Sequence, residues 1–95
     1  MTIITKQELL ELQKDPQNFV FDVREEDEYE QGHIPQAILA PWHSIIERMA
    51  GVKPQTPIIL YCNTGIRAQK AAKMLEDKNF TNVSVYRGGW EDWNN

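Results

Sequence analysis

The sequence predicts a small α/β domain, in which a mostly parallel sheet of about five strands carries helices on both faces. Short apolar runs typical of buried strands alternate with segments that repeat apolar residues at helical spacing. This alternation favours parallel strands joined by crossover helices. The 95 residues, of which 41% are hydrophobic and 25% are charged, suit one domain spanning residues 1–95 around a single core.

The N-terminal third begins with a short edge strand at Ile3-Ile4. Thr5 followed by Glu8 predicts a capping box, which opens a helix of apolar leucines. Asp15-Pro16 ends this helix, because the residue before a proline is disfavoured in the helical region. The apolar run from Phe19 to Phe21 then predicts a second, buried strand.

The middle of the chain is expected to contain an acidic helix at 25–31, a strand at 37–40 and a short helix at 43–49. Gly32 stops the acidic helix, and its carboxylates at 25–28 are interpreted as a solvated face. His33 is interpreted as a turn residue bonded to the backbone, and His43 as an exposed residue at a helix start. Neither histidine is therefore the expected general base.

The last third carries the pattern that points to chemistry. Residues 58–61 form an apolar, β-branched run after Pro57, and Cys62 follows directly. Asn63-Thr64-Gly65 predicts a tight turn, and alanines and a leucine then mark one face of a helix over 68–78. A final strand is expected at 83–86, followed by a turn and a short terminal segment that ends near Trp93.

Cys62 is the only cysteine, and its predicted place is where a buried strand ends and a helix is about to begin. In open α/β sheets, ligands bind beyond the carboxyl ends of the strands. Free N–H groups at a helix start and in a tight loop would stabilise a thiolate there. Arg67 adds a permanent positive charge. The pattern favours a nucleophilic sulfur in an anion-binding loop; the alternative is a small buried hydrophobic residue.

Composition narrows the other possibilities. One cysteine excludes an internal disulfide and a cysteine-rich zinc site, and we expect neither a metal nor a cofactor. Sulfur carried on Cys62 would therefore have to leave to another molecule. A net charge of −4 argues against nucleic acid, and no apolar run reaches the roughly 18 residues of a membrane span. The first residues lack signal-peptide features, so we expect a cytoplasmic protein, unless a leader was removed beforehand.

Three segments carry motifs that occur together in one known family. In chain order they are Phe21-Asp22-Val23-Arg24 with Glu28-Tyr29, Gly32-His33-Ile34-Pro35 and Ala37; Tyr61-Cys62-Asn63-Thr64-Gly65-Ile66-Arg67 with Ala68 and Ala71-Ala72; and Val85-Tyr86-Arg87-Gly88-Gly89-Trp90 with Trp93. Over nearly its whole length the chain thus resembles the single-domain rhodanese-like sulfurtransferases. It departs from them at Gln36, where the family usually has glycine, and at Leu39, where asparagine is frequent.

The resemblance implies a role for each matched residue. Cys62 would be the nucleophile that carries a sulfane sulfur as a persulfide. Arg67 and Arg24 would steady the loop or the charge of the donor, while Asp22 would brace the loop by accepting hydrogen bonds from its N–H groups. The loop that holds the sulfur and an anionic donor would comprise Asn63, Thr64, Gly65, Ile66 and Arg67.

The implied activity is that of a thiosulfate sulfurtransferase, or rhodanese. The donor would be thiosulfate or a persulfide, and the acceptor cyanide, a thiol or a protein. Two alternatives stay open. Phosphatases and arsenate reductases of the same fold have five residues between cysteine and arginine, whereas four separate Cys62 from Arg67. A non-enzymatic sulfur carrier or interaction module could also share the fold, although such modules commonly lose the cysteine.

Overall fold

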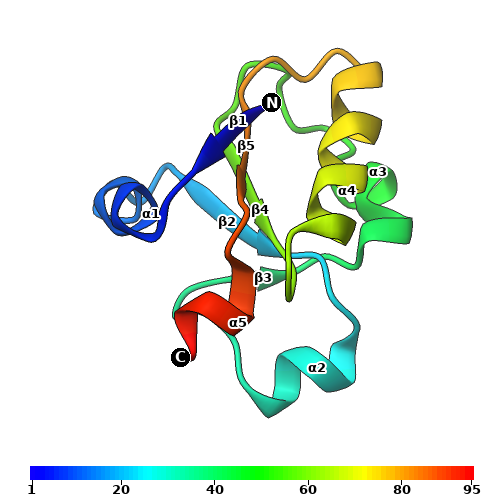
Figure 1. Cartoon of the computed structure of the whole chain (residues 1–95). Helices are drawn as coiled ribbons and strands as arrows, with labels where there is room; N and C mark the ends of the chain where they lie inside the picture. The colour runs from blue at the N-terminus through cyan, green and yellow to red at the C-terminus, as the bar shows by residue number, and fades with distance from the viewer.

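The computed structural model describes all 95 residues and contains one five-stranded, fully parallel sheet with the order β1-β5-β4-β2-β3 (Figure 1). The predicted strand number and parallel arrangement are therefore confirmed. The strands are β1 (Thr2–Ile4), β2 (Phe19–Asp22), β3 (Ile38–Leu39), β4 (Ile58–Tyr61) and β5 (Val83–Tyr86). The helices are α1 (Lys6–Leu12), α2 (Glu26–Gln31), the 3-10 turn η1 (Trp42–Ser44), α3 (Ile45–Arg48), α4 (Ile66–Asp77) and α5 (Gly89–Trp93).

Helices cover both faces of the sheet, as predicted: α3 and α4 pack on one face and α1 on the other (Figure 1). Central strand β4 is buried along its whole length. Its side chains alternate, so that Ile58 and Leu60 join the core under α4, while Ile59 and Tyr61 join the core on the α1 side. Cys62 continues the alternation and therefore faces the α4 side.

Local signals account well for the start of α1. The Thr5 hydroxyl accepts a hydrogen bond from the Glu8 N–H at 3.2 Å, and the Glu8 carboxylate accepts one from the Thr5 N–H at 2.9 Å. This is the reciprocal capping box that the two residues predict. The helix ends at Leu12, three residues before Asp15-Pro16, because turns fill the intervening stretch.

Three elements differ most from the prediction, apart from shifts of a single residue elsewhere. The third strand covers only residues 38–39, because the Ala37 N–H turns back to the Ile34 carbonyl. The helix expected at 43–49 is divided into η1 and α3. Helix α4 begins at 66 rather than 68, because Gly65 caps it in the left-handed region with φ +92°. The third difference matters most, since it brings the helix start to within four residues of Cys62.

The turn after Pro35 holds Gln36 in the left-handed region, with φ +72°. At this position the family that the sequence resembles usually has glycine, the residue that adopts such angles without steric cost. His33, two residues before Pro35, bonds through its Nδ1 to the Tyr29 carbonyl at 2.9 Å, as predicted for a turn residue. His43 is exposed and lies 3.3 Å from the Glu25 carboxylate.

The two ends of the chain lie at opposite ends of the sheet (Figure 1). The N-terminus begins edge strand β1, whereas α5 and the C-terminus lie beyond the carboxyl ends of the strands. Helix α2 lies at that same end. None of the helices is long and apolar enough to cross a membrane.

Candidate active site

Cys62 is the first residue after β4, and its side chain is 1% exposed. Its Sγ accepts hydrogen bonds from two backbone N–H groups, that of Gly65 at 3.1 Å and that of Ala68 at 3.4 Å. Ala68 belongs to the first turn of α4, whose N–H groups have no helical partners and whose dipole is positive. The sulfur thus lies where a negative charge is stabilised.

Helix α5 fixes the outer side of the Cys62 loop. The Trp90 N–H donates to the Cys62 carbonyl at 2.8 Å, and the Glu91 N–H donates to the Asn63 carbonyl at 3.3 Å. Because a trans peptide directs its C=O and N–H to opposite sides, these bonds leave the N–H groups of residues 63 and 64 on the other side of the loop.

Gly89 permits this close approach between α5 and the loop. Its φ is +67°, and a Cβ atom there would lie 2.4 Å from the Cys62 carbonyl oxygen and 2.5 Å from that of Asn63. Gly89 of the third motif therefore shapes the cysteine loop, although it lies far from Cys62 in sequence. At position 89 only glycine, which has no Cβ atom, leaves the carbonyl groups of Cys62 and Asn63 where they are.

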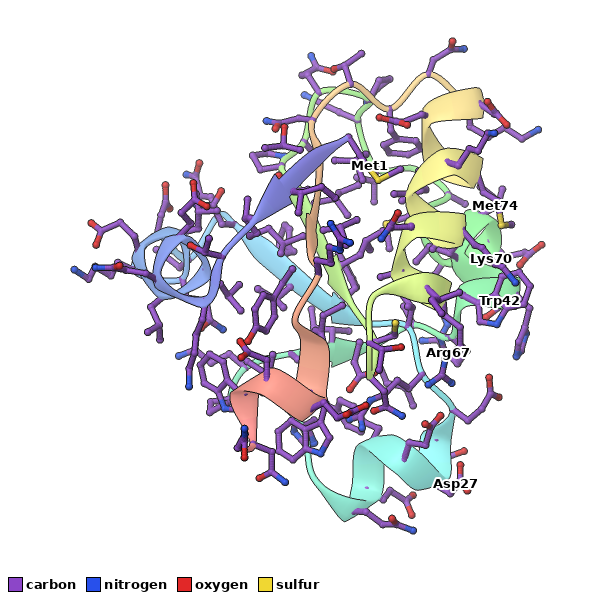
Figure 2. The ribbon with its side chains drawn as sticks, in the orientation of Figure 1. Met1, Asp27, Trp42, Arg67, Lys70 and Met74 are labelled. Atoms are coloured by element: carbon purple, nitrogen blue, oxygen red, sulfur yellow. The ribbon has the colours of Figure 1, made fainter.

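Arg67 points from the first turn of α4 towards α2, where it forms a two-pronged ion pair with Glu28 (Figure 2). Its Nη1 and Nη2 donate to the two carboxylate oxygens at 2.7 and 3.0 Å. These hydrogen bonds are the main reason that the pKa of Glu28 falls from 4.5 to about 2. The pKa of Arg67 is raised, chiefly by the same bonds and further by the negative charges of Glu28 and Cys62.

The expectation that Glu28 belongs to a solvated acidic face is wrong. Its side chain is 28% exposed and binds Asn63 and Arg67 of the Cys62 loop. Besides Arg67, it accepts a hydrogen bond from the Asn63 side-chain amide at 2.8 Å and one from the Glu25 N–H at 3.0 Å. No acidic residue lies three or four positions from Arg67 in the sequence, so the helix itself offers Arg67 no ion-pair partner. This absence indicates that the partner comes from another element.

A second ion pair lies beneath the loop and is almost fully buried. Asp22 and Arg24 are 0% and 2% exposed, and the guanidinium donates to both carboxylate oxygens at 2.7–3.1 Å. Tyr61, which pairs with Asp22 across the β2–β4 ladder, donates its hydroxyl to the Asp22 carboxylate at 2.6 Å. Burial acts to lower the pKa of Arg24, but the hydrogen bonds and charge of Asp22 outweigh it and raise that pKa.

Asp22 supports the loop indirectly, which corrects the expected contact with loop N–H groups. Its backbone partner is the Arg24 N–H, at 2.9 Å. Arg24 in turn donates to the Asn63 side-chain oxygen at 3.1 Å and to the Gly32 carbonyl at 2.7 Å. The Asn63 side chain therefore lies between the Arg24–Asp22 pair and the Arg67–Glu28 pair, and it links them beside Cys62.

The predicted loop residues differ in their surroundings. Gly65 donates to the sulfur, and Asn63 and Arg67 hold the loop through Glu28. Thr64 and Ile66 are exposed, with Ile66 at 64%. Sequence reasoning missed Ala68, Glu28 and Gly89. No group of three His, Cys, Asp or Glu side chains is arranged to hold a metal ion.

Fold and site together define a parallel α/β domain that presents one cysteine to the start of a helix at the carboxyl edge of its sheet. Comparison with known sequences makes this assignment specific. The chain belongs to the rhodanese-like domain family, which it matches over residues 5–95.

Two curated relatives agree with this assignment, and a solved structure shares the fold. The chain is 32% identical over 90 residues to thiosulfate sulfurtransferase GlpE of Coxiella burnetii, which covers 95% of this chain and 84% of that protein. It is 34% identical over 92 residues to thiosulfate:glutathione sulfurtransferase of Saccharomyces cerevisiae, which covers 83% and 66%. The human single-domain sulfurtransferase TSTD1 shares the fold, with a TM-score of 0.84 and 20% identity over 99% of this chain and 96% of that one.

Proposed function

We propose that this chain is a sulfurtransferase that moves a sulfane sulfur from thiosulfate or a persulfide to a thiophilic acceptor through a persulfide on Cys62. One observation carries the proposal: Cys62 Sγ accepts hydrogen bonds from the N–H groups of Gly65 and Ala68 at the start of α4. Such donors favour the thiolate, which is the nucleophilic form of cysteine. The names of the bacterial and yeast relatives support the same class of reaction.

The reaction needs two steps at one sulfur. In the first, the Cys62 thiolate attacks the outer sulfur of thiosulfate, the S–S bond of the donor breaks, and sulfite leaves with the bonding electrons. In the second, a thiol or, in an assay, cyanide attacks the outer sulfur of the Cys62 persulfide and regenerates the thiolate. This is covalent catalysis, for which ping-pong kinetics are expected. Because Cys62 is the only cysteine, the acceptor belongs to another molecule.

The loop N–H groups would stabilise the thiolate and the persulfide anion in turn. Preorganised N–H donors are effective in such sites because they need no reorganisation when charge moves. Here the bonds from α5 to the Cys62 and Asn63 carbonyls preorganise the loop. Asn63, held between Arg24 and Glu28, secures its first residue.

The test is sulfur loading followed by turnover. Incubation with thiosulfate should raise the intact mass of the protein by one sulfur atom, and addition of cyanide should remove it and yield thiocyanate. Cys62→Ser should fold normally and show neither change, because the hydroxyl retains the size but not the nucleophilicity. Thiocyanate formation by the serine variant at the parent rate would exclude Cys62 as the nucleophile. A loaded protein that passes sulfur to no acceptor would instead indicate a carrier or interaction module.

A further inference from the structure

The two arginines nearest the Cys62 loop are already neutralised by carboxylates. Arg24 is paired with Asp22 in the protein interior, and Arg67 is paired with Glu28. Glu28 is fully engaged: Oε1 accepts from Arg67 and the Glu25 N–H, and Oε2 accepts from Arg67 and the Asn63 amide. Neither of these two arginines is therefore free to attract an anionic donor.

Other charges near the loop do not restore a strong positive field. Arg87, which would contact a Cβ at Gly65, and Lys70, which lies over the Trp42 ring, are both exposed, so solvent and salt screen their charges. On the opposite side, α2 presents further exposed carboxylates, among them Asp27 (Figure 2). The surroundings of the sulfur are thus close to neutral or acidic.

We propose that Glu28 determines the donor class: by neutralising Arg67, it sets the Cys62 loop for a hydropersulfide donor in preference to dianionic thiosulfate. This inference rests on the proposed sulfurtransferase function. Glu28 would act through Arg67 and Asn63 rather than on the reacting atoms, so it is a positioning and specificity residue.

The two donors place different charges at the site. Thiosulfate carries two negative charges, and its reaction with the Cys62 thiolate yields the Cys62 persulfide anion and sulfite, with a total charge of −3 before and after. A hydropersulfide, R–S–S–H, is neutral before it ionises. The Cys62 thiolate attacks its outer sulfur, the donor S–S bond breaks, and the leaving thiolate takes the proton, so the total charge is −1. With the ionised donor R–S–S⁻ the same step leaves a free thiolate and has a total charge of −2, still less than with thiosulfate. A site whose two bonded arginines are both neutralised, and whose remaining cations are exposed to solvent, discriminates against the first reaction by Coulomb repulsion.

The experiment measures the rate of sulfur loading on Cys62, by intact mass, with thiosulfate and with cysteine hydropersulfide as donors. Glu28→Gln should raise the thiosulfate-to-hydropersulfide ratio of kcat/KM about fivefold, mainly through a lower KM for thiosulfate, and this gain should shrink as salt increases. Asp27→Asn is the matched control, because it removes the same charge from the same helix without touching the loop. Its ratio should stay at the parent value.

Two more variants keep the test decisive if Glu28→Gln folds poorly. Arg67→Gln leaves Glu28 unpaired and should lower the ratio. The double variant Glu28→Gln with Arg67→Gln is again neutral and should return the ratio towards that of the parent. If Arg67 instead bound thiosulfate directly, the double variant would stay as low as Arg67→Gln, and the proposal would be overturned.

The remaining outcomes separate this inference from the function on which it rests. Equal losses with both donors in Glu28→Gln would make Glu28 only structural, and this inference alone would be wrong. Failure of the parent protein to load sulfur from either donor would overturn the proposed function and the inference together.

Discussion

Gly89→Ala tests how the cysteine loop is held. The new Cβ would lie 2.4 Å from the Cys62 carbonyl oxygen and 2.5 Å from the Asn63 carbonyl oxygen, so α5 and the loop must move apart. Three costs follow: a left-handed backbone with a side chain costs roughly 1–2 kcal/mol, and each of the two hydrogen bonds from α5 contributes about 1 kcal/mol. The free energy of unfolding should therefore fall by about 3–4 kcal/mol.

Gly51→Ala is a matched control, because Gly51 also has a positive φ, +85°, but a Cβ there would meet nothing within 4 Å. Gly51→Ala should lower the free energy of unfolding only by the cost of a left-handed backbone with a side chain, roughly 1–2 kcal/mol. The reduced freedom of the unfolded chain favours alanine equally in both variants and cancels in the comparison. Urea unfolding followed by circular dichroism would give the difference, expected to be about 2 kcal/mol.

Sulfur transfer should separate these two variants further. In Gly89→Ala the displaced loop no longer directs its N–H groups at Sγ, and loss of such donors costs about a hundredfold or more in rate. Gly51→Ala should retain the parent rate, because Gly51 lies in the loop between α3 and β4. If the two variants had equal stability and Gly89→Ala kept the parent rate, the account of how α5 holds the loop would be refuted.

Three further predictions concern the ion pairs and the loop length. Arg24→Met should lower the free energy of unfolding by about 3–5 kcal/mol, because it leaves Asp22 buried without a cation. Lys14→Met, which breaks the exposed ion pair with Glu11, should change this free energy little in the same urea titration. The pKa of Glu28 is depressed to about 2, so its contribution to stability is complete above about pH 4.5 and is lost as the pH falls towards 2. The free energy of unfolding of Glu28→Gln, measured in urea, should therefore depend less on pH across that window. A pH profile identical to that of the parent protein would argue against the ion pair with Arg67. A glycine inserted between Gly65 and Ile66 should reduce thiosulfate turnover at least tenfold, with folding checked by circular dichroism, and weak aryl phosphate hydrolysis would accompany the loss. Undiminished sulfur transfer by the folded variant would show that loop length does not select the substrate.

The fold was predictable because its signals are local. Four of the five strands are marked by apolar runs, and Thr5 and Glu8 cap α1 through residues three positions apart. The third strand was predicted too long because all four residues of 37–40 are apolar, whereas only Ile38 and Leu39 pair with the sheet. Ala37 and Ala40 are apolar because they are buried outside the strand. The start of α4 was placed two residues late, because Ile66 and Arg67 lie off the apolar face that marks the helix.

The site was predictable to the extent that it lies on one stretch of chain. Cys62 and Gly65 fall within a single strand–turn–helix unit. The contacts of Glu28 with Arg67, and of Gly89 with the Cys62 carbonyl, join elements that only the folded sheet brings together. An acidic residue on a short helix has the same local pattern whether it faces water or an arginine of another element, so composition alone could not identify Glu28.

The position of α5 has a consequence for joining this protein to others. Its five residues hold the cysteine loop and lead directly to the C-terminus, while the N-terminus lies at the other end of the sheet (Figure 1). A sulfur acceptor tethered by a flexible linker after Asn95 would start at the same end of the sheet as Cys62 and would gain a higher effective concentration there. The same acceptor tethered before Met1 would have to pass around the whole sheet, so the order of a fusion, rather than linker composition alone, would govern the rate of intramolecular sulfur transfer.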